Sequence, residues 1–276
     1  MSTLVAYISG FLILARIVTS SLLALAVILP SVHKGNSFGA SLLFALPFFL
    51  TAIGGFALND FFDSAKDSVN KPYRAIPSGK LPPIVVLSTG FTLLSFSLIL
   101  AVLISRNIKE LFLYGLTICG AAFYNVFVKY VSLSKTFLTS ILSAVPMLYS
   151  VNFFNYPTAY LLLPLATLSF VLGREWLMDI RDMRGDIVDK TVTIPMLVGP
   201  TITERLGFGL QLLSIILLIP IAINSGSTSS FVLILLVLLS VVLSMRVWYW
   251  RSGAFQHRAV QGFWIPMLLG ELMLLQ

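Results

Sequence analysis

The stretch "NDFFDSAKDSVNKPYR", residues 59–74, places three aspartates and three cations directly after the apolar run 41–58. On a helix, its D-x-x-D-x-x-x-D spacing puts Asp60, Asp63 and Asp67 on one face. Three neighbouring carboxylates repel one another, and near a bilayer they also lose hydration. The stretch therefore predicts a cationic partner for these carboxylates at the end of a membrane-spanning helix.

The composition of the chain around this stretch indicates an integral membrane protein. Of 276 residues, 58% are hydrophobic and only 11% are charged, whereas soluble domains carry roughly 25% charged residues. A helix needs about 20 residues to cross the hydrocarbon. The sequence predicts an all-α integral membrane bundle of nine transmembrane helices, forming a single domain over residues 1–276. The nine apolar segments lie at about 3–32, 41–58, 84–105, 111–128, 136–154, 158–172, 206–224, 231–247 and 259–275.

The distribution of lysine and arginine predicts the orientation of this bundle. With nine spans, the loops on one side carry 13 of these residues and the loops on the other side carry three. The positive-inside rule places the rich side and the N-terminus in the cytoplasm. Topology thus explains the net charge of +7 without a nucleic-acid partner. Arg16 interrupts the first apolar segment, so we expect a retained helix there rather than a signal peptide. Compact loops and the lack of an organelle-type leader favour a prokaryotic cytoplasmic membrane.

A second aspartate cluster repeats the first at a fixed distance along the chain. Four expected spans separate the two clusters, so both face the same side of the membrane. Such an arrangement predicts a parallel internal repeat with a site between the copies. An offset of 119 residues relates Asp60, Asp63 and Asp67 to Asp179, Asp182 and Asp186, and Lys71 to Lys190.

The paired clusters suit a divalent cation and a polyanion. Mg²⁺ takes oxygen ligands and commonly uses one or two carboxylates together with a substrate phosphate. Two facing aspartate helices could each hold Mg²⁺ against one shared diphosphate, with Lys71, Arg74 and Lys190 on its outer oxygens. The apolar bundle suits a long hydrocarbon tail. A membrane transporter is the alternative from another class, but a transporter is expected to carry its functional charges near the bilayer midplane.

At these residues the sequence resembles the UbiA superfamily of intramembrane prenyltransferases. The first family motif is matched by "NDFFDSAKD" (59–67) and "NKPYRAIPSG" (70–79), and the second by "DIRDMRGD" (179–186). A third element, a tyrosine and a lysine after the fourth span, is matched by "YNVFVK" (124–129). The family often has a Gly-Asn pair after this lysine, whereas this chain has "SLSKT" (132–136).

The resemblance implies a central cavity open to the cytoplasmic side, two Mg²⁺ ions and a prenyl diphosphate substrate. It implies that Asn59, Asp63 and Asp67 hold one ion and that Asp182 and Asp186 hold the other. The diphosphate would be bound by Lys71, Arg74, Tyr124 and Lys129, together with Lys190 from the repeat and Arg16 from the first helix. Asp60, Asp179 and Tyr124 form the candidate catalytic set, with the two aspartates as further ligands or as groups that orient or deprotonate an acceptor.

The reaction implied is ionisation of an allylic prenyl diphosphate followed by transfer of the prenyl group. An aromatic ring is the acceptor favoured by the resemblance, because it is the commonest one in the family. The stretch "DIRDMRGD" (179–186) with the following "TIP" also resembles archaeal-type lipid prenyltransferases, so a glycerol-phosphate lipid acceptor is an alternative. Without an external acceptor, the same scaffold would be a terpene cyclase.

Overall fold

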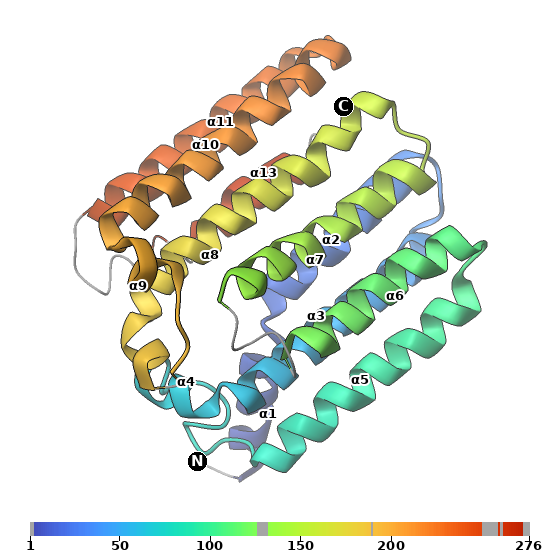
Figure 1. The fold of residues 1–276 in the computed structure, drawn as a ribbon. Coiled ribbons are helices and arrows are strands. Elements are labelled where there is room, and N and C mark those ends of the chain that lie inside the picture. The colour runs from blue at the N-terminus through green and yellow to red at the C-terminus, as the bar shows by residue number, and fades with distance from the viewer. Residues whose placement is uncertain (1–2, 126–131, 189, 250–258, 260–261, 273–276) are drawn as a thin grey trace.

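The protein is described by a computed structural model that covers residues 3–125, 132–188, 190–249, 259 and 262–272. All regular elements in these residues are helices, as the sequence predicted (Figure 1). The elements are α1 (Thr3–Ala15), α2 (Ile17–His33), α3 (Phe38–Phe62), α4 (Ser64–Asn70), α5 (Pro83–Ile104), α6 (Ile108–Phe123), α7 (Ser132–Phe153), the 3₁₀ helix η2 (Thr158–Leu161), α8 (Leu162–Val188), α9 (Ile194–Val198), α10 (Pro200–Ser225), α11 (Thr228–Tyr249) and α13 (Trp264–Leu272).

Six of the described helices are long and apolar enough to cross a membrane: α3, α5, α7, α8 with η2, α10 and α11. The pair α1 and α2 forms a seventh candidate span that bends by 46°. The outward faces carry large apolar side chains, such as Leu235 at 63% exposure and Ile99 at 56%, which suits contact with lipid. The chain is therefore a multi-pass membrane protein.

The helices lie side by side and run nearly along one direction, with α5 at one edge of the bundle and α10 and α11 at the other (Figure 1). Two pairs, α3–α5 and α8–α10, pack through facing glycines. A Cβ atom on Gly54 would lie 3.1 Å from the carbonyl oxygen of Gly90. A Cβ atom on Gly207 would lie 3.0 Å from the carbonyl oxygen of Gly173. Small residues at such crossings let two helix backbones approach closely in a membrane.

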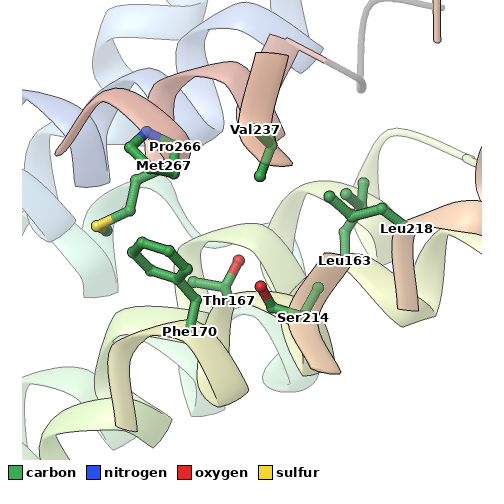
Figure 2. A pocket seen from close by; sticks show the side chains of 10 residues that line it. Leu163, Thr167, Phe170, Ser214, Leu218, Val237, Pro266 and Met267 are labelled. Carbon is green, nitrogen blue, oxygen red and sulfur yellow. The ribbon is translucent and has the colours of Figure 1, made fainter. Parts of the chain in front are cut away.

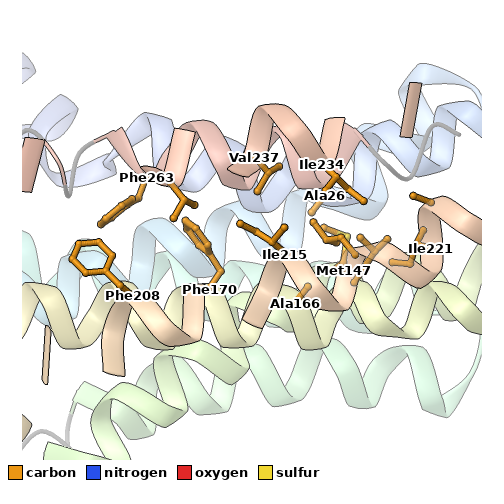
Figure 3. Packing of buried hydrophobic residues seen from close by; sticks show 14 of the residues in the cluster. Ala26, Met147, Ala166, Phe170, Phe208, Ile215, Ile221, Ile234, Val237 and Phe263 are labelled. Atoms are coloured by element: carbon orange, nitrogen blue, oxygen red, sulfur yellow. The ribbon is translucent and has the colours of Figure 1, made fainter. Parts of the chain in front are cut away.

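The largest apolar cluster joins α8, α10, α11 and the C-terminal helix α13. Phe170 of α8 meets Phe263 edge-to-face with ring centroids 5.9 Å apart (Figure 3). Phe208 and Ile215 of α10 and Val237 of α11 fill the space around them. Close packing of this kind, rather than a hydrophobic driving force, holds helices together in lipid. It fixes α8, which carries the second aspartate motif.

A small crevice of about 40 Å³ opens between the same helices (Figure 2). Leu163, Phe170 and Leu218 line it together with the hydroxyl-bearing Thr167 and Ser214. The second aspartate motif begins several helical turns further along α8, at about 1.5 Å per residue. The crevice is thus separate from the charged end of the bundle.

A buried polar cluster lies at the start of α6. Glu110, which is 0% exposed, accepts hydrogen bonds from Arg106 Nη2 at 3.0 Å and from the Tyr149 hydroxyl. Asn107 caps the helix by accepting from the Glu110 N–H at 3.0 Å. The 16 residues of α6 span about 24 Å at 1.5 Å per residue, so this cluster is far from the other end of the helix, at Tyr124.

Candidate active site

The two aspartate motifs, 119 residues apart in the chain, meet at one end of the bundle. Lys71 connects them, with Nζ 2.8 Å from Asp182 Oδ2 and 3.6 Å from Asp67 Oδ1. Lys66 of α4 forms a second connection, through an ion pair with Asp186 of α8. The structure therefore brings together the two carboxylate sets that the repeat predicted to share a site.

The backbone of the second motif is held by Asn70, the last residue of α4. Its Nδ2 donates to the Asp182 carbonyl at 2.7 Å, and its Oδ1 accepts from the Gly185 N–H at 3.0 Å. A Cβ atom on Gly185 would clash with the Asn70 amide, so glycine is required for this approach. We refer to these two hydrogen bonds as the Asn70 clamp.

The first motif forms where α3 ends at Asp63 and the chain turns into the short helix α4. Asn59 Nδ2 donates to Asp63 Oδ2 at 2.9 Å, and Lys135 Nζ of α7 lies 3.7 Å from the same oxygen. Asp63 and Asp67 are 7% and 3% exposed. Burial raises the pKa of Asp67 above its usual value and lowers the pKa of Lys71 below its usual value.

Asp60 forms ion pairs with two arginines. Its Oδ1 lies 2.5 Å from Arg16 Nη2 and 3.1 Å from Arg74 Nη1, and Asp60 is fully buried. Arg16 also donates to Asn59 Oδ1 at 3.1 Å and lies 4.3 Å from the ring centroid of Phe56. Arg16 can reach these partners because it occupies the break between α1 and α2, with φ of 42°.

The second motif lies on the last turns of α8. Asp182 accepts two hydrogen bonds from Arg181, from Nε at 2.6 Å and from Nη2 at 2.9 Å, in addition to its contact with Lys71. Asp186 is fully buried. The Oδ2 atom of Asp179 is buried without a hydrogen-bond partner among the described residues. Arg174 and Glu175 pair with each other at 2.9 Å.

Three further residues were predicted as diphosphate ligands: Tyr124, Lys129 and Lys190. The ring centroid of Tyr124, at the end of α6, lies 5.9 Å from Lys135 Nζ. Lys190 is exposed and adopts a left-handed backbone conformation with φ of 54°. Lys129 lies outside the described residues.

The structure adds four residues that sequence reasoning did not select: Lys66, Asn70, Lys135 and Arg181. Lys66 and Arg181 lie inside the two motifs, so a count of charges within each motif was the available signal. Lys135 gave no such signal, because it reaches Asp63 from α7, a distant helix. Within the part of the chain that the structure describes, six cations contact five of the predicted aspartates: Arg16, Lys66, Lys71, Arg74, Lys135 and Arg181 against Asp60, Asp63, Asp67, Asp182 and Asp186.

The donor atoms of the site suit Mg²⁺, although the carboxylates do not form a complete coordination site by themselves. Among the described residues, no group of three His, Cys, Asp or Glu side chains lies close enough to hold a metal ion. Asn59, Asp63, Asp67, Asp182 and Asp186 nevertheless supply only oxygen ligands in two adjacent sets. Mg²⁺ typically binds one or two carboxylates and completes its shell with water and substrate phosphate, which fits this donor set.

The fold and the site define an all-helical, multi-span membrane protein with two aspartate motifs at one end of its bundle. The chain belongs to the UbiA prenyltransferase family, whose family model matches residues 17–265. It is a prenyltransferase, as the three motifs predicted.

Curated relatives are digeranylgeranylglyceryl phosphate synthases. That of Saccharolobus solfataricus is 30% identical over 241 residues, which cover 84% of this chain and 84% of the relative. That of Methanothrix thermoacetophila is 34% identical over 161 residues, which cover 53% of this chain and 54% of the relative. The fold also matches a solved UbiA homologue from Archaeoglobus fulgidus bound to GPP and Mg²⁺, with a TM-score of 0.71, 14% identity, and coverage of 96% of this chain and 99% of that chain.

Proposed function

We propose that this prenyltransferase is Mg²⁺-dependent and transfers the prenyl group of an allylic prenyl diphosphate to a hydroxyl of a glyceryl phosphate lipid. The observation that carries the proposal is the meeting of two aspartate motifs and six cations at the end of an apolar helix bundle. The names of the curated relatives support the lipid acceptor. They give no support to the aromatic acceptor that the resemblance favoured.

In the proposed complex, Asn59, Asp63 and Asp67 hold one Mg²⁺, and Asp182 and Asp186 hold a second. Bound Mg²⁺ would neutralise the charge that develops on the leaving diphosphate. Positive side chains placed in advance stabilise such charge without reorganising during the reaction. The cations that would bind the diphosphate oxygens are Arg16, Lys66, Lys71, Arg74, Lys135 and Arg181, with Tyr124, Lys129 and Lys190 as further candidates.

The transfer breaks the bond between the prenyl C1 atom and the diphosphate oxygen and forms an ether bond from C1 to the acceptor oxygen. The hydroxyl proton must then pass to a base. Asp60 is a poor base, because two guanidinium groups hold its carboxylate. Asp179 is better suited, because its buried Oδ2 accepts no hydrogen bond from any described residue.

We further propose that the chain is one domain with nine spans, a central cavity open to the cytoplasmic side, and a cytoplasmic N-terminus in a prokaryotic cell membrane. The internal repeat is supported by packing as well as by motif. The offset of 119 residues that relates the aspartates also relates Gly54 and Leu58 of α3 to Gly173 and Leu177 of α8. Leu58 packs against Gly90 and Leu177 against Gly207, at 2.7 and 3.1 Å from a Cβ atom built there.

The purified protein in nanodiscs, supplied with Mg²⁺ and geranylgeranyl diphosphate, tests the proposal. Mass spectrometry would follow three reactions, with a glyceryl phosphate lipid that bears one prenyl ether, with an aromatic acid, or with no acceptor. We expect an ether product only in the reaction that contains the lipid acceptor. The Asp63→Asn variant should not form this product. An aromatic product, or a terpene without acceptor, would replace the acceptor assignment.

A further inference from the structure

Asp60 holds two arginines together in a buried charged network. Its side chain is 0% exposed, and its Oδ1 lies 2.5 Å from Arg16 Nη2 and 3.1 Å from Arg74 Nη1. Its Oδ2 lies 3.5 Å from the same atom of Arg74. The two arginines come from different places in the chain, the break between α1 and α2 and the segment that follows α4. One carboxylate therefore holds two like charges side by side.

This network leaves donor groups of both arginines unused. The Nε atoms of Arg16 and Arg74 are buried, and neither donates a hydrogen bond to any described residue. Two guanidinium groups against the one carboxylate of Asp60 leave an excess of positive charge in the network. Burial and the neighbouring Arg16 lower the pKa of Arg74 below its usual value, and Asp67 lies within electrostatic reach of Arg74. The network can therefore take an additional anion beside the proposed metal ligands.

The network is also connected to the first aspartate motif. Arg16 Nη2 donates a second hydrogen bond, to Asn59 Oδ1 at 3.1 Å. The Asn59 Nδ2 atom in turn donates to Asp63 Oδ2 at 2.9 Å. Asp60 is thus linked through Arg16 to two proposed metal ligands.

We propose that Asp60 is a positioning residue, whose carboxylate orients Arg16 and Arg74 so that their remaining N–H groups bind the diphosphate together. This inference rests on the proposed function, and it gives Asp60 neither an Mg²⁺ ion nor the acceptor proton. A guanidinium group binds phosphate oxygens through a planar fork of N–H donors, so its orientation matters as well as its charge. Two adjacent guanidinium groups repel each other, and a long side chain without a partner is free to change rotamer. Asp60 offsets the repulsion and fixes the orientation.

Three measurements on Asp60→Asn test this role. Isothermal titration gives the affinity for geranylgeranyl thiolodiphosphate, a non-reactive analogue, in the presence of Mg²⁺. The ether-product assay at saturating substrate gives kcat and the Mg²⁺ concentration for half-maximal rate. We expect the affinity for the analogue to fall about tenfold or more, the equivalent of one hydrogen bond to a charged group. The Mg²⁺ concentration for half-maximal rate should stay as in the wild type. Asp60→Glu, which keeps the carboxylate, should bind the analogue more tightly than Asp60→Asn.

Glu110→Gln is the matched control, because Glu110 is also a fully buried carboxylate paired with an arginine, Arg106, at the other end of α6. It should bind the analogue as the wild type does. If Asp60→Asn does not fold, Arg16→Gln/Asp60→Asn removes one buried charge of each sign and is compared with Arg16→Gln. The double variant should bind the analogue about threefold or more weakly than Arg16→Gln, because Arg74 also loses its partner.

The outcomes separate the roles open to Asp60. Equal or tighter binding of the analogue by Asp60→Asn would overturn the proposal, because the carboxylate would then compete with the diphosphate for the arginines. A raised Mg²⁺ requirement at saturating substrate would make Asp60 a metal ligand, and a loss of kcat alone would make it the base. A wild type that does not bind the analogue would refute the proposed function itself. Normal binding and product formation by both the wild type and Asp60→Asn would refute only the positioning role.

Discussion

The Asn70 clamp gives the sharpest prediction about the site. Asn70→Ala removes two partly buried hydrogen bonds, at 2.7 and 3.0 Å, between α4 and the backbone of α8. A hydrogen bond of this kind contributes about 1 kcal/mol net, so the pair contributes about 2 kcal/mol. If the clamp holds the two motifs in register, diphosphate affinity in the presence of Mg²⁺ should fall up to about 30-fold, the equivalent of that free energy.

Isothermal titration with a non-reactive thiolodiphosphate analogue measures this loss, and thermal unfolding reports any general damage. Asn152→Ala is the matched control, because Asn152 is exposed on α7 and donates a hydrogen bond within its own helix, to the Leu148 carbonyl at 2.8 Å. Asn70→Asp should be worse than Asn70→Ala, because its carboxylate would face the Asp182 carbonyl. A change of less than about threefold in Asn70→Ala would refute the reasoning.

A double-mutant cycle gives an independent check of the same contact. Gly185→Ala places a methyl group where the Asn70 amide lies, so it should displace that side chain and cause a similar loss. The two substitutions break one interaction, so combining them should cost little more than either alone. Additive losses would mean that Gly185 acts through some other contact.

Three further outcomes are expected. Asp186→Asn should lower turnover about 10²-fold or more, because it removes a charge that would hold Mg²⁺ at the reacting phosphate. It should also lower the unfolding temperature, because the buried Lys66 loses its carboxylate partner. Near-normal turnover would remove Asp186 from the site. Gly173→Ala should destabilise the protein by about 1–3 kcal/mol, because the added methyl meets the Gly207 backbone; an unchanged unfolding temperature would contradict the close approach. Glu110→Leu should lower the free energy of unfolding by about 1–3 kcal/mol, because it leaves the Tyr149 hydroxyl without its acceptor. The protein that remains folded should form product at the normal rate. A loss of turnover would mean that the two ends of α6 are coupled.

The meeting of the two aspartate motifs could be predicted from the sequence, because the spacing and the even number of spans depend only on local pattern. The partners of each carboxylate could not. The choice of Lys66 for Asp186 and Lys135 for Asp63 depends on the relative placement of α4, α7 and α8. That placement follows from helix packing, which periodicity does not encode.

The span count shows the same limit. Apolar runs located the long helices well, and the expected segment 41–58 lies within α3. The first run, expected at 3–32, is instead two helices that break at Arg16. The break places the Arg16 guanidinium against Asp60, a contact 44 residues away in the chain that a local pattern could not reveal.

The glycine contacts within α3–α5 and α8–α10 have a mechanical consequence. Where the two backbones are in contact, no side chain can change rotamer to let the helices slide past each other. Each helix pair should therefore move as a rigid body. If the bundle opens to admit a lipid, the opening must then occur between these two helix pairs, on either side of α2 and α7. Spin labels on α3 and α5 should keep a constant separation when substrate binds, while labels on α3 and α8 should show the change.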